Sequence, residues 1–167
     1  MDRLYSPWRL AYVTAAADPA PACIFCEPSV GEAQAPLVVA AGAHCYVILN
    51  LYPYNSGHLM VVPRRHAATL SALDGEELSE LMRFTQRAER ALTEVYRPHG
   101  INVGLNLGRA AGAGVADHLH IHLVPRWTGD TNFMSVVGDV RVLPEEVPES
   151  ARRLRPVFAR LADAADA

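Results

Sequence analysis

Histidine alternates with apolar residues at positions 118–125, where the sequence is His-Leu-His-Ile-His-Leu-Val-Pro. A β-strand turns successive side chains to opposite faces, so this pattern places His118, His120 and His122 on one face and apolar side chains on the other. The chain has seven histidines, and three of them fall within this run. Clustered histidines mark metal or catalytic sites far more often than solvated strand faces. The run predicts a strand with one core face and one chemical face.

The composition limits the possible partners. The chain has 167 residues, half of them apolar, which is enough for one buried core, and we expect a single domain over 1–167. A net charge of −3 predicts no general attraction to nucleic acid or anionic membranes, so any phosphate affinity belongs to a local site. No apolar run approaches the ~20 residues of a membrane helix, and the first residues lack signal-peptide features. We expect a cytoplasmic protein without a nucleic-acid or membrane partner.

The order of strand and helix patterns is typical of an α+β fold. Asp74 and Glu77 form a capping-box pattern ahead of apolar residues at helical spacing, which predicts a long helix ending near Pro98. A second amphipathic helix is expected from about Glu149. Short apolar segments predict strands at 37–40, 44–49, 59–62, 101–107 and 118–124.

These elements predict a mostly antiparallel sheet with the long helix packed on it and a C-terminal helix. We divide the predicted domain into an N-terminal arm with a Cys-x-x-Cys knuckle (1–36), a core (37–144) and the C-terminal helix (145–167).

A glycine-rich segment at 108–114 separates the last two predicted strands. Glycines let backbone N–H groups approach an anion closely, although a tight turn explains such glycines about as often. Beside this loop, three histidines leave two chemistries open. Three imidazoles can bind a catalytic zinc ion that keeps an open water position. Alternatively, one imidazole attacks an electrophile while its neighbours position and protonate the surrounding groups.

Cys23 and Cys26 form a Cys-x-x-Cys pair near the start of the chain. A disulfide framework would leave one of the three cysteines unpaired, and close cysteine pairs in a reducing compartment more often bind metal or do redox work. The residues at 27–31 predict a loop, whereas a thioredoxin-like redox pair would open a helix. The pair therefore favours a metal, and Cys45, in an apolar strand, is predicted to be core.

Taken in order, these motifs resemble the histidine triad (HIT) family of nucleotide hydrolases and transferases. The histidine run is similar to the family's His-φ-His-φ-His-φ-φ motif, where φ is apolar. The opening Leu-Tyr-Ser-Pro-Trp-Arg (4–9) and the segment 127–133 are most similar to the actinobacterial branch that resembles diadenosine tetraphosphate phosphorylases. The resemblance implies a HIT-like fold and a homodimer. Further matching segments are Asn50, Ser-Gly-His (56–58), Val-Pro-Arg-Arg-His (62–66), Asn-Leu-Gly (106–108) and Val-Pro-Arg (124–126).

The resemblance also implies catalytic roles. His120 would attack the α-phosphorus of a nucleotide and form a nucleotidyl-histidine intermediate. An unperturbed imidazole pKa near 6.5 agrees with this role, because a neutral ring with a free lone pair then exists at neutral pH. His122 and His58 would supply hydrogen bonds where negative charge develops on the leaving group.

Substrate contacts are implied at Asn50 near the ribose and at Gly112 and Gly114 through the loop backbone, and Asn106 is implied near the phosphates or the nucleophile. A turn residue at a strand end would also account for Asn50. The loop departs from the family pattern, in which Gln and then Ser or Thr follow the glycine. Here Ala113 and Gly114 occupy that stretch, with one extra residue before the histidines. Either backbone N–H groups hold the phosphate, or the space admits a larger group such as a free phosphate acceptor.

Zinc-containing members of the family complete such a knuckle with two histidines. Carried over, this implies a metal site of Cys23, Cys26, His66 and His118. A closed two-cysteine, two-histidine site is structural, so we expect a structural Zn²⁺ that ties the N-terminal segment to the catalytic strand.

We therefore expect a homodimeric enzyme that cleaves diadenosine polyphosphates, as a phosphorylase or a hydrolase, through adenylyl-His120. The alternatives are a nucleoside phosphoramidase of the same family and a nucleotide-binding sensor without turnover. An intact triad favours an enzyme, because binding alone needs no imidazole aimed at phosphorus. The sequence leaves open whether water or phosphate accepts the adenylyl group.

Overall fold

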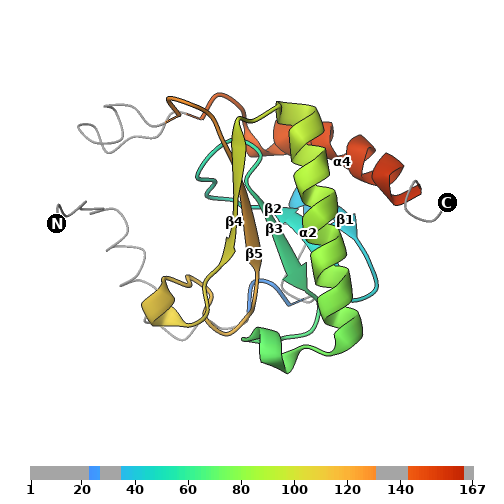
Figure 1. The fold of residues 1–167 in the computed structure, drawn as a ribbon, viewed down its shortest axis with the longest axis vertical. Coiled ribbons are helices and arrows are strands. Elements are labelled where there is room, and N and C mark those ends of the chain that lie inside the picture. Colours follow the sequence, from blue (N-terminus) through green and yellow to red (C-terminus); the bar gives the residue numbers. More distant parts are fainter. Residues whose placement is uncertain (1–22, 27–34, 131–142, 164–167) are drawn as a thin grey trace.

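The computed structural model describes residues 23–26, 35–130 and 143–163, which form one antiparallel sheet and two long helices (Figure 1). This confirms the predicted α+β class. The helices are α2 (Gly75–Tyr96) and α4 (Val147–Asp163). The spatial order of the strands is β1-β2-β3-β5-β4. Their bounds are β1 (Val38–Ala41), β2 (Cys45–Leu49), β3 (Leu59–Pro63), β4 (Gly100–Leu105) and β5 (Ile121–Arg126).

The centre of the sheet is the main core of the molecule. Every residue of β2 and β3 is buried, and the two strands pair antiparallel across the predicted long loop at 50–58. Helix α2 packs across β2, β3 and β5 and buries Leu81, Ala88 and Leu92 completely. Burying an aliphatic side chain of leucine size contributes about 1.5–3 kcal/mol to the free energy of unfolding. This layer therefore stabilises the part of the sheet from which the histidines extend.

The start of α2 is fixed by the predicted capping box. The Asp74 carboxylate accepts hydrogen bonds from the backbone N–H groups of Glu76 and Glu77, and the Glu77 carboxylate accepts one from the Asp74 backbone. Arg65 also donates to both Glu77 oxygens, at 2.7 and 2.6 Å, and with the Asp74 N–H it lowers the pKa of Glu77 to about 2. The helix start is therefore fastened to the segment that follows β3.

The last strand is shorter at its start than the sequence pattern predicts, because β5 begins at Ile121 and not at His118. In the β3–β5 pairing Val61 lies opposite Ile121, so continuing that register would place Pro63 opposite Leu119. Proline has no N–H for the ladder. Leu119 donates its N–H to the Ala67 carbonyl instead. The alternation still holds, since Leu119, Ile121 and Leu123 are all buried in the core.

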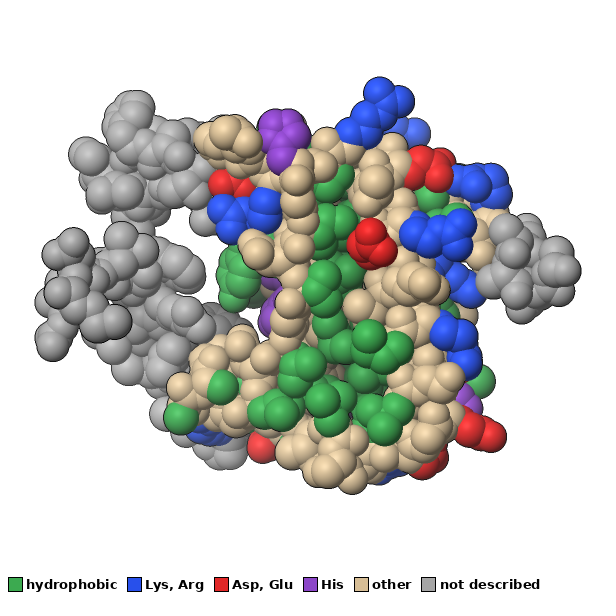
Figure 2. Space-filling view, in the orientation of Figure 1, with side chains coloured by type: hydrophobic (Ala, Val, Ile, Leu, Met, Phe, Trp, Pro, Cys, Tyr) green, Lys and Arg blue, Asp and Glu red, His purple; other side chains and the backbone are tan. Residues whose placement is uncertain are grey.

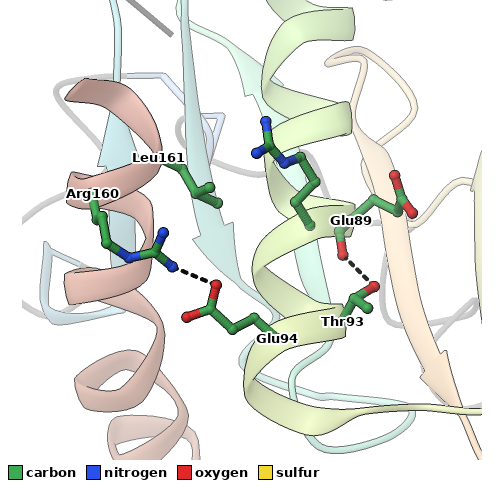
Figure 3. Close-up of a pocket in the computed structure, with 6 residues that line it drawn as sticks. Glu89, Thr93, Glu94, Arg160 and Leu161 are labelled. Atoms are coloured by element: carbon green, nitrogen blue, oxygen red, sulfur yellow. Dashed lines mark hydrogen bonds and ion pairs between the residues drawn. The ribbon is translucent and has the colours of Figure 1, made fainter. Parts of the chain in front are cut away.

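Helix α4 packs on α2 and on β1. At the α2–α4 contact Arg160 pairs with Glu94, and Thr93 donates its hydroxyl to the Glu89 carbonyl at 2.9 Å (Figure 3). Together with Arg90 and Leu161 these residues line a cavity of about 310 Å³. None of them belongs to the predicted site, so this cavity is separate from the histidines.

The predicted N-terminal arm at 1–36 lies outside the described residues, apart from the knuckle at 23–26 and residues 35 and 36. Positions 131–133 of the motif at 127–133 also lie outside them. Within the described segments, neither long helix has the length and apolar character needed to cross a membrane.

Candidate active site and metal centre

Two backbone carbonyls fix the ring orientations of His118 and His120. A carbonyl oxygen can only accept a hydrogen bond, so the histidine nitrogen facing it must carry the proton. Nε2–H of His118 donates to the Pro63 carbonyl at 2.8 Å, which leaves its Nδ1 with a free lone pair. Nδ1–H of His120 donates to the His118 carbonyl at 2.9 Å, which leaves its Nε2 with a free lone pair. His118 and His120 therefore keep their free lone pairs on different ring nitrogens, Nδ1 in His118 and Nε2 in His120.

A backbone N–H fixes the second pair of histidines in the same way. The Tyr54 N–H donates to Nδ1 of His58 at 3.1 Å, so that nitrogen carries no proton. Nε2 of neutral His58 is then protonated and donates to Nδ1 of His122 at 2.9 Å. The remaining proton of neutral His122 is on Nε2. His58 is fully buried. Its partner His122 lies 64 residues further along the chain.

Both outer nitrogens of this cluster are accessible. In the described part of the chain, Nε2 of His120 and Nε2 of His122 have no hydrogen-bond partner. Among the described side chains, Ser56 Oγ is the polar atom that is both fully buried and without a partner. Each unpartnered Nε2 therefore keeps some solvent exposure. The His120 and His122 rings lie 4.8 Å apart at 78°. A ring with a free Nε2 lone pair and a ring with an Nε2–H donor are therefore direct neighbours in this buried cluster.

Burial keeps these imidazoles neutral. Loss of solvent lowers the pKa of His120, although its hydrogen bond to the His118 carbonyl acts in the other direction. For His122, burial and then the neighbouring His120 lower the pKa to about 4. A neutral imidazole keeps the lone pair that a nucleophile needs, so His120 is available for attack at neutral pH.

The loop at 50–58 holds His58 in place. Oδ1 of Asn50 accepts from the Tyr52 N–H at 3.0 Å, which turns its Nδ2 towards Nδ1 of His58 at 3.4 Å. Gly57 has a left-handed φ of 77°, and a Cβ there would lie 2.7 Å from the Tyr96 ring, so this turn needs glycine. In this structure Asn50 acts as a turn residue, and its predicted ribose contact stays a prediction.

A polar clamp behind this loop was missed by sequence reasoning. Asn55 is buried and donates to the Pro125 carbonyl at 2.9 Å and to the Asp130 carboxylate at 2.8 Å. Arg126 donates to both Asp130 oxygens, at 2.6 and 2.8 Å, and holds the pKa of Asp130 far below its usual range. The clamp joins the loop that carries His58 to the end of β5. The only local signal for it is an Arg and an Asp four residues apart.

The glycine-rich loop lies between β4 and His118 and includes the short turn η3 (Arg109–Ala111). Gly112 has a φ of 91°, and its N–H donates to the Arg109 carbonyl at 2.9 Å. The loop thus uses part of its backbone to close its own turn. The substrate contacts of Asn106, Gly112 and Gly114 remain predictions.

The four predicted metal ligands come together in space. One ligand atom from each of the four residues lies within 4.8 Å of every other. Three pairs are closer, with Cys23 Sγ 3.3 Å and Cys26 Sγ 3.7 Å from His118 Nδ1, and Cys26 Sγ 3.3 Å from His66 Nδ1. The free lone pair of His118 therefore faces the sulfurs. The complete set is Cys23, Cys26, His66 and His118.

This cluster fits a zinc ion. Zn–S and Zn–N bonds of about 2.3 and 2.0 Å at tetrahedral angles place ligand atoms about 3.5 Å apart, close to the separations of these pairs. Burial and the neighbouring Cys23 raise the pKa of the Cys26 thiol, and a bound cation would offset that effect. Four protein ligands leave no open position, as is usual for a structural site.

Comparisons with known proteins agree with this geometry. Residues 32–129 match the family model described as HIT domain. The chain is 47% identical over 168 residues to the AP-4-A phosphorylase of Mycobacterium tuberculosis (strain ATCC 25618 / H37Rv), covering 96% of this chain and 86% of that protein. A Zn-bound histidine triad family protein from Mycobacterium smegmatis superposes with a TM-score of 0.62 at 28% identity, covering 92% of this chain and 96% of that one.

Proposed function

Because this chain belongs to the HIT domain family, we propose that it cleaves diadenosine polyphosphates through a covalent intermediate on His120. The family and the relative at 47% identity make it an enzyme of the nucleotidyl hydrolase and transferase class. That relative is named AP-4-A phosphorylase, which favours diadenosine tetraphosphate as the substrate. One observation carries the mechanism: Nδ1–H of His120 is tethered to a carbonyl, which leaves the lone pair on its Nε2.

The reaction uses that lone pair. Nε2 of His120 attacks the α-phosphorus, and the bond from that phosphorus to the bridging oxygen breaks. ATP leaves from diadenosine tetraphosphate, and AMP stays on the ring through a phosphorus–nitrogen bond. An acceptor oxygen then attacks the same phosphorus and releases His120. Splitting one hard displacement into two easier ones is the usual advantage of a covalent nucleophile.

His122 is the proposed hydrogen-bond donor to the departing oxygen, through its Nε2–H. His58 has a different role, because its other nitrogen accepts from the Tyr54 backbone N–H, which cannot give up its proton. The proton that His58 shares with His122 therefore cannot be replaced through the Tyr54 amide. His58 orients His122 and supplies no proton of its own, in contrast to the donor role expected from the sequence.

Phosphate is the proposed acceptor. The loop carries Ala113 and Gly114 where most relatives have polar side chains, and the relative at 47% identity is named a phosphorylase. Attack by phosphate on adenylyl-His120 gives ADP, whereas attack by water gives AMP. Incubation with diadenosine tetraphosphate at millimolar phosphate, followed by anion-exchange chromatography, should yield ADP and ATP in equal amounts. AMP as the main product would overturn the acceptor, and no turnover at all would overturn the function.

The metal cluster is proposed to hold a structural zinc ion. When bound, the ion supplies no chemistry to the substrate and cross-links the N-terminal knuckle to the segments around His66 and His118. The Zn-bound relative from Mycobacterium smegmatis and the fit of the four ligand atoms support this. Elemental analysis of the purified protein should find about one zinc per chain. Absence of metal, with the same stability after treatment with a chelator, would reject it.

Two copies of this chain are proposed to pair through β4. In the described sheet β4 is an edge strand that pairs with β5 alone, and exposed edges invite pairing with another chain. Apolar side chains gather on the face over β4 and α2 (Figure 2). Val103 on β4 is 51% exposed and Met82 on α2 is 59% exposed. The patch and the edge together fit a second copy of the same surface.

Light scattering after size-exclusion chromatography tests this interface. The wild-type chain should elute at twice the chain mass, and Val103→Lys should shift it towards the monomer because a charge then lies at the strand edge. Ala43→Lys in the exposed β1–β2 turn is the matched control and should stay dimeric. A monomeric wild-type protein, or an unchanged mass for Val103→Lys, would contradict the proposal.

A further inference from the structure

Phe25 connects the metal knuckle to the central histidine. It lies between the two cysteines and is 4% exposed. Its ring centroid is 5.7 Å from that of His118 at 74°, and 5.0 Å from that of His120 at 47°. Both separations are within the range of favourable aromatic contacts. One ring of the knuckle thus packs against a metal ligand and against the proposed nucleophile.

The backbone of Phe25 is held from the opposite side. Tyr46 in β2 is 2% exposed, and its hydroxyl donates to the Phe25 carbonyl at 2.8 Å. Within the knuckle, the Cys26 N–H donates to the Cys23 carbonyl at 3.1 Å and closes a turn around Phe25. The position of Phe25 is therefore set by a central strand of the sheet as well as by the cysteines.

His120 needs such support. Its hydrogen bond to the His118 carbonyl directs Nδ1, but small rotations about the Cα–Cβ and Cβ–Cγ bonds can still tilt the ring without breaking that hydrogen bond. Within the described residues, the aromatic neighbours that limit this tilt are Phe25 and His122. Tilting moves Nε2, the atom farther from the tether. Displacing a reacting atom by about 1 Å can cost up to 10²-fold in rate.

We propose that Phe25 is a positioning residue for the reaction, whose ring holds the His120 imidazole at the angle from which Nε2 reaches phosphorus. This inference rests on the proposed function of His120 as the nucleophile. It gives the knuckle a second task, because the knuckle presents the ring that supports His120 as well as two metal ligands.

The test compares two substitutions between the same cysteines. In the zinc-loaded protein, Phe25→Leu keeps an apolar side chain but removes the flat ring, whereas Ile24→Ala truncates a residue that is 45% exposed. Phe25→Leu should lower kcat with diadenosine tetraphosphate by about 10- to 100-fold, within the range for a misplaced reacting group. KM, the Kd for AMP and the zinc content should stay within about 3-fold of wild type. Ile24→Ala should match the wild type in all of them.

A second readout needs no activity. Long-range ¹H–¹⁵N correlation spectra of histidine-labelled protein report which ring nitrogen of His120 carries the proton. The wild type should show narrow His120 ring signals in the Nδ1–H form, and Phe25→Leu should keep that form but broaden the signals, because a tilting ring exchanges between orientations. Unchanged spectra together with unchanged kcat in Phe25→Leu would overturn the proposal. If the spectra change but neither protein turns over dinucleotide, the proposed function has failed while the support of His120 by Phe25 stands.

Tyr46→Phe covers the case in which Phe25→Leu loses zinc or fails to fold. It removes the hydroxyl that holds the Phe25 carbonyl and leaves the knuckle sequence intact. The expected result is a fall in kcat of about 3- to 10-fold with zinc retained, since an indirect support is weakened and not removed. A wild-type kcat in Tyr46→Phe, with Phe25→Leu defective only through lost zinc, would show that Phe25 serves the metal site alone.

Discussion

His118 and His120 lie two residues apart just before β5, and each donates one ring proton to a backbone carbonyl. His118 does so through Nε2, so its free Nδ1 faces the cysteine sulfurs. His120 does so through Nδ1, so the free lone pair is on its Nε2. Burial lowers the pKa of both rings. The same residue type on the same segment thus keeps its free nitrogen on the side of the cysteines in one case and at the proposed reactive position in the other.

This difference separates the roles proposed for His118 and His120. The side chains are chemically identical and similarly buried, so neither composition nor burial separates them. The deciding feature is which nitrogen the backbone occupies, because the other nitrogen keeps the lone pair. If the two positions are separable, substitutions at the reactive side, around His120, should act mainly on turnover. Substitutions at the metal side, around His118, should act mainly on stability.

The largest effect is expected on the reactive side. His120→Ala should lower kcat by roughly 10⁴-fold or more, because removal of a covalent nucleophile leaves only binding and electrostatic contributions. AMP binding, measured by calorimetry, should survive. His99→Ala removes an exposed histidine outside the cluster and should keep wild-type turnover. Substantial turnover by His120→Ala would remove the distinction between His120 and its neighbours.

The buried histidine pair comes next. His58→Asn should lower kcat by about 10²-fold, because it removes the N–H that orients His122 and leaves Nδ1 of His122 without its partner. His122→Asn should cost more, since it removes the donor itself. If His58→Asn proves as damaging as His122→Asn, a proton path through His58 would replace the orienting role.

The metal side is expected to behave in the opposite way. Cys26→Ser should lose zinc and lower the melting temperature by several degrees, while kcat of the folded fraction falls by no more than about 10-fold, because Tyr46 still holds the Phe25 carbonyl. Cys45→Ala removes a cysteine outside the cluster and should retain about one zinc per chain. Elemental analysis, thermal melting and kcat corrected for the folded fraction measure these effects. Zinc removal that stops turnover in a still folded protein would favour the metal-bound water mechanism that the sequence left open.

Local patterns in the sequence were enough to predict much of this architecture. The capping box of Asp74 and Glu77 and the alternation of histidine with apolar residues depend on neighbours within a few positions, and the structure contains both. The metal cluster was predicted from the family resemblance, and its four ligand atoms do converge. Local spacing is informative wherever the chain's own period decides which face is buried.

The remainder depends on contacts between distant parts of the chain. The β3–β5 ladder ends before Pro63, which a continued register would place opposite Leu119, and only the strand register reveals this. The different roles proposed for His58 and His122 rest on a backbone N–H and on a partner 64 residues away. The clamp of Asn55 on Asp130 joins residues 75 positions apart. No periodicity encodes such pairs, since they exist only once the sheet has formed.

The smallest effect concerns the pH dependence of stability. Burial and the neighbouring His120 lower the pKa of His122 to about 4, whereas an unfolded histidine titrates near 6.5. Between these values the unfolded chain binds the proton more readily, so the free energy of unfolding falls as the pH drops from about 6.5 towards 4. One such group contributes a slope of at most about 1.4 kcal/mol per pH unit.

Replacing that group should flatten the curve. His122→Asn should therefore lose less stability than the wild type between pH 6.5 and 4.5, and the two melting curves should run parallel above pH 7. His99→Asn, which keeps His122, should follow the wild type throughout. Melting temperatures at half-unit pH steps measure the difference. Parallel curves for His122→Asn and the wild type over the whole range would mean that His122 titrates normally, and burial would then no longer account for a neutral donor beside His120.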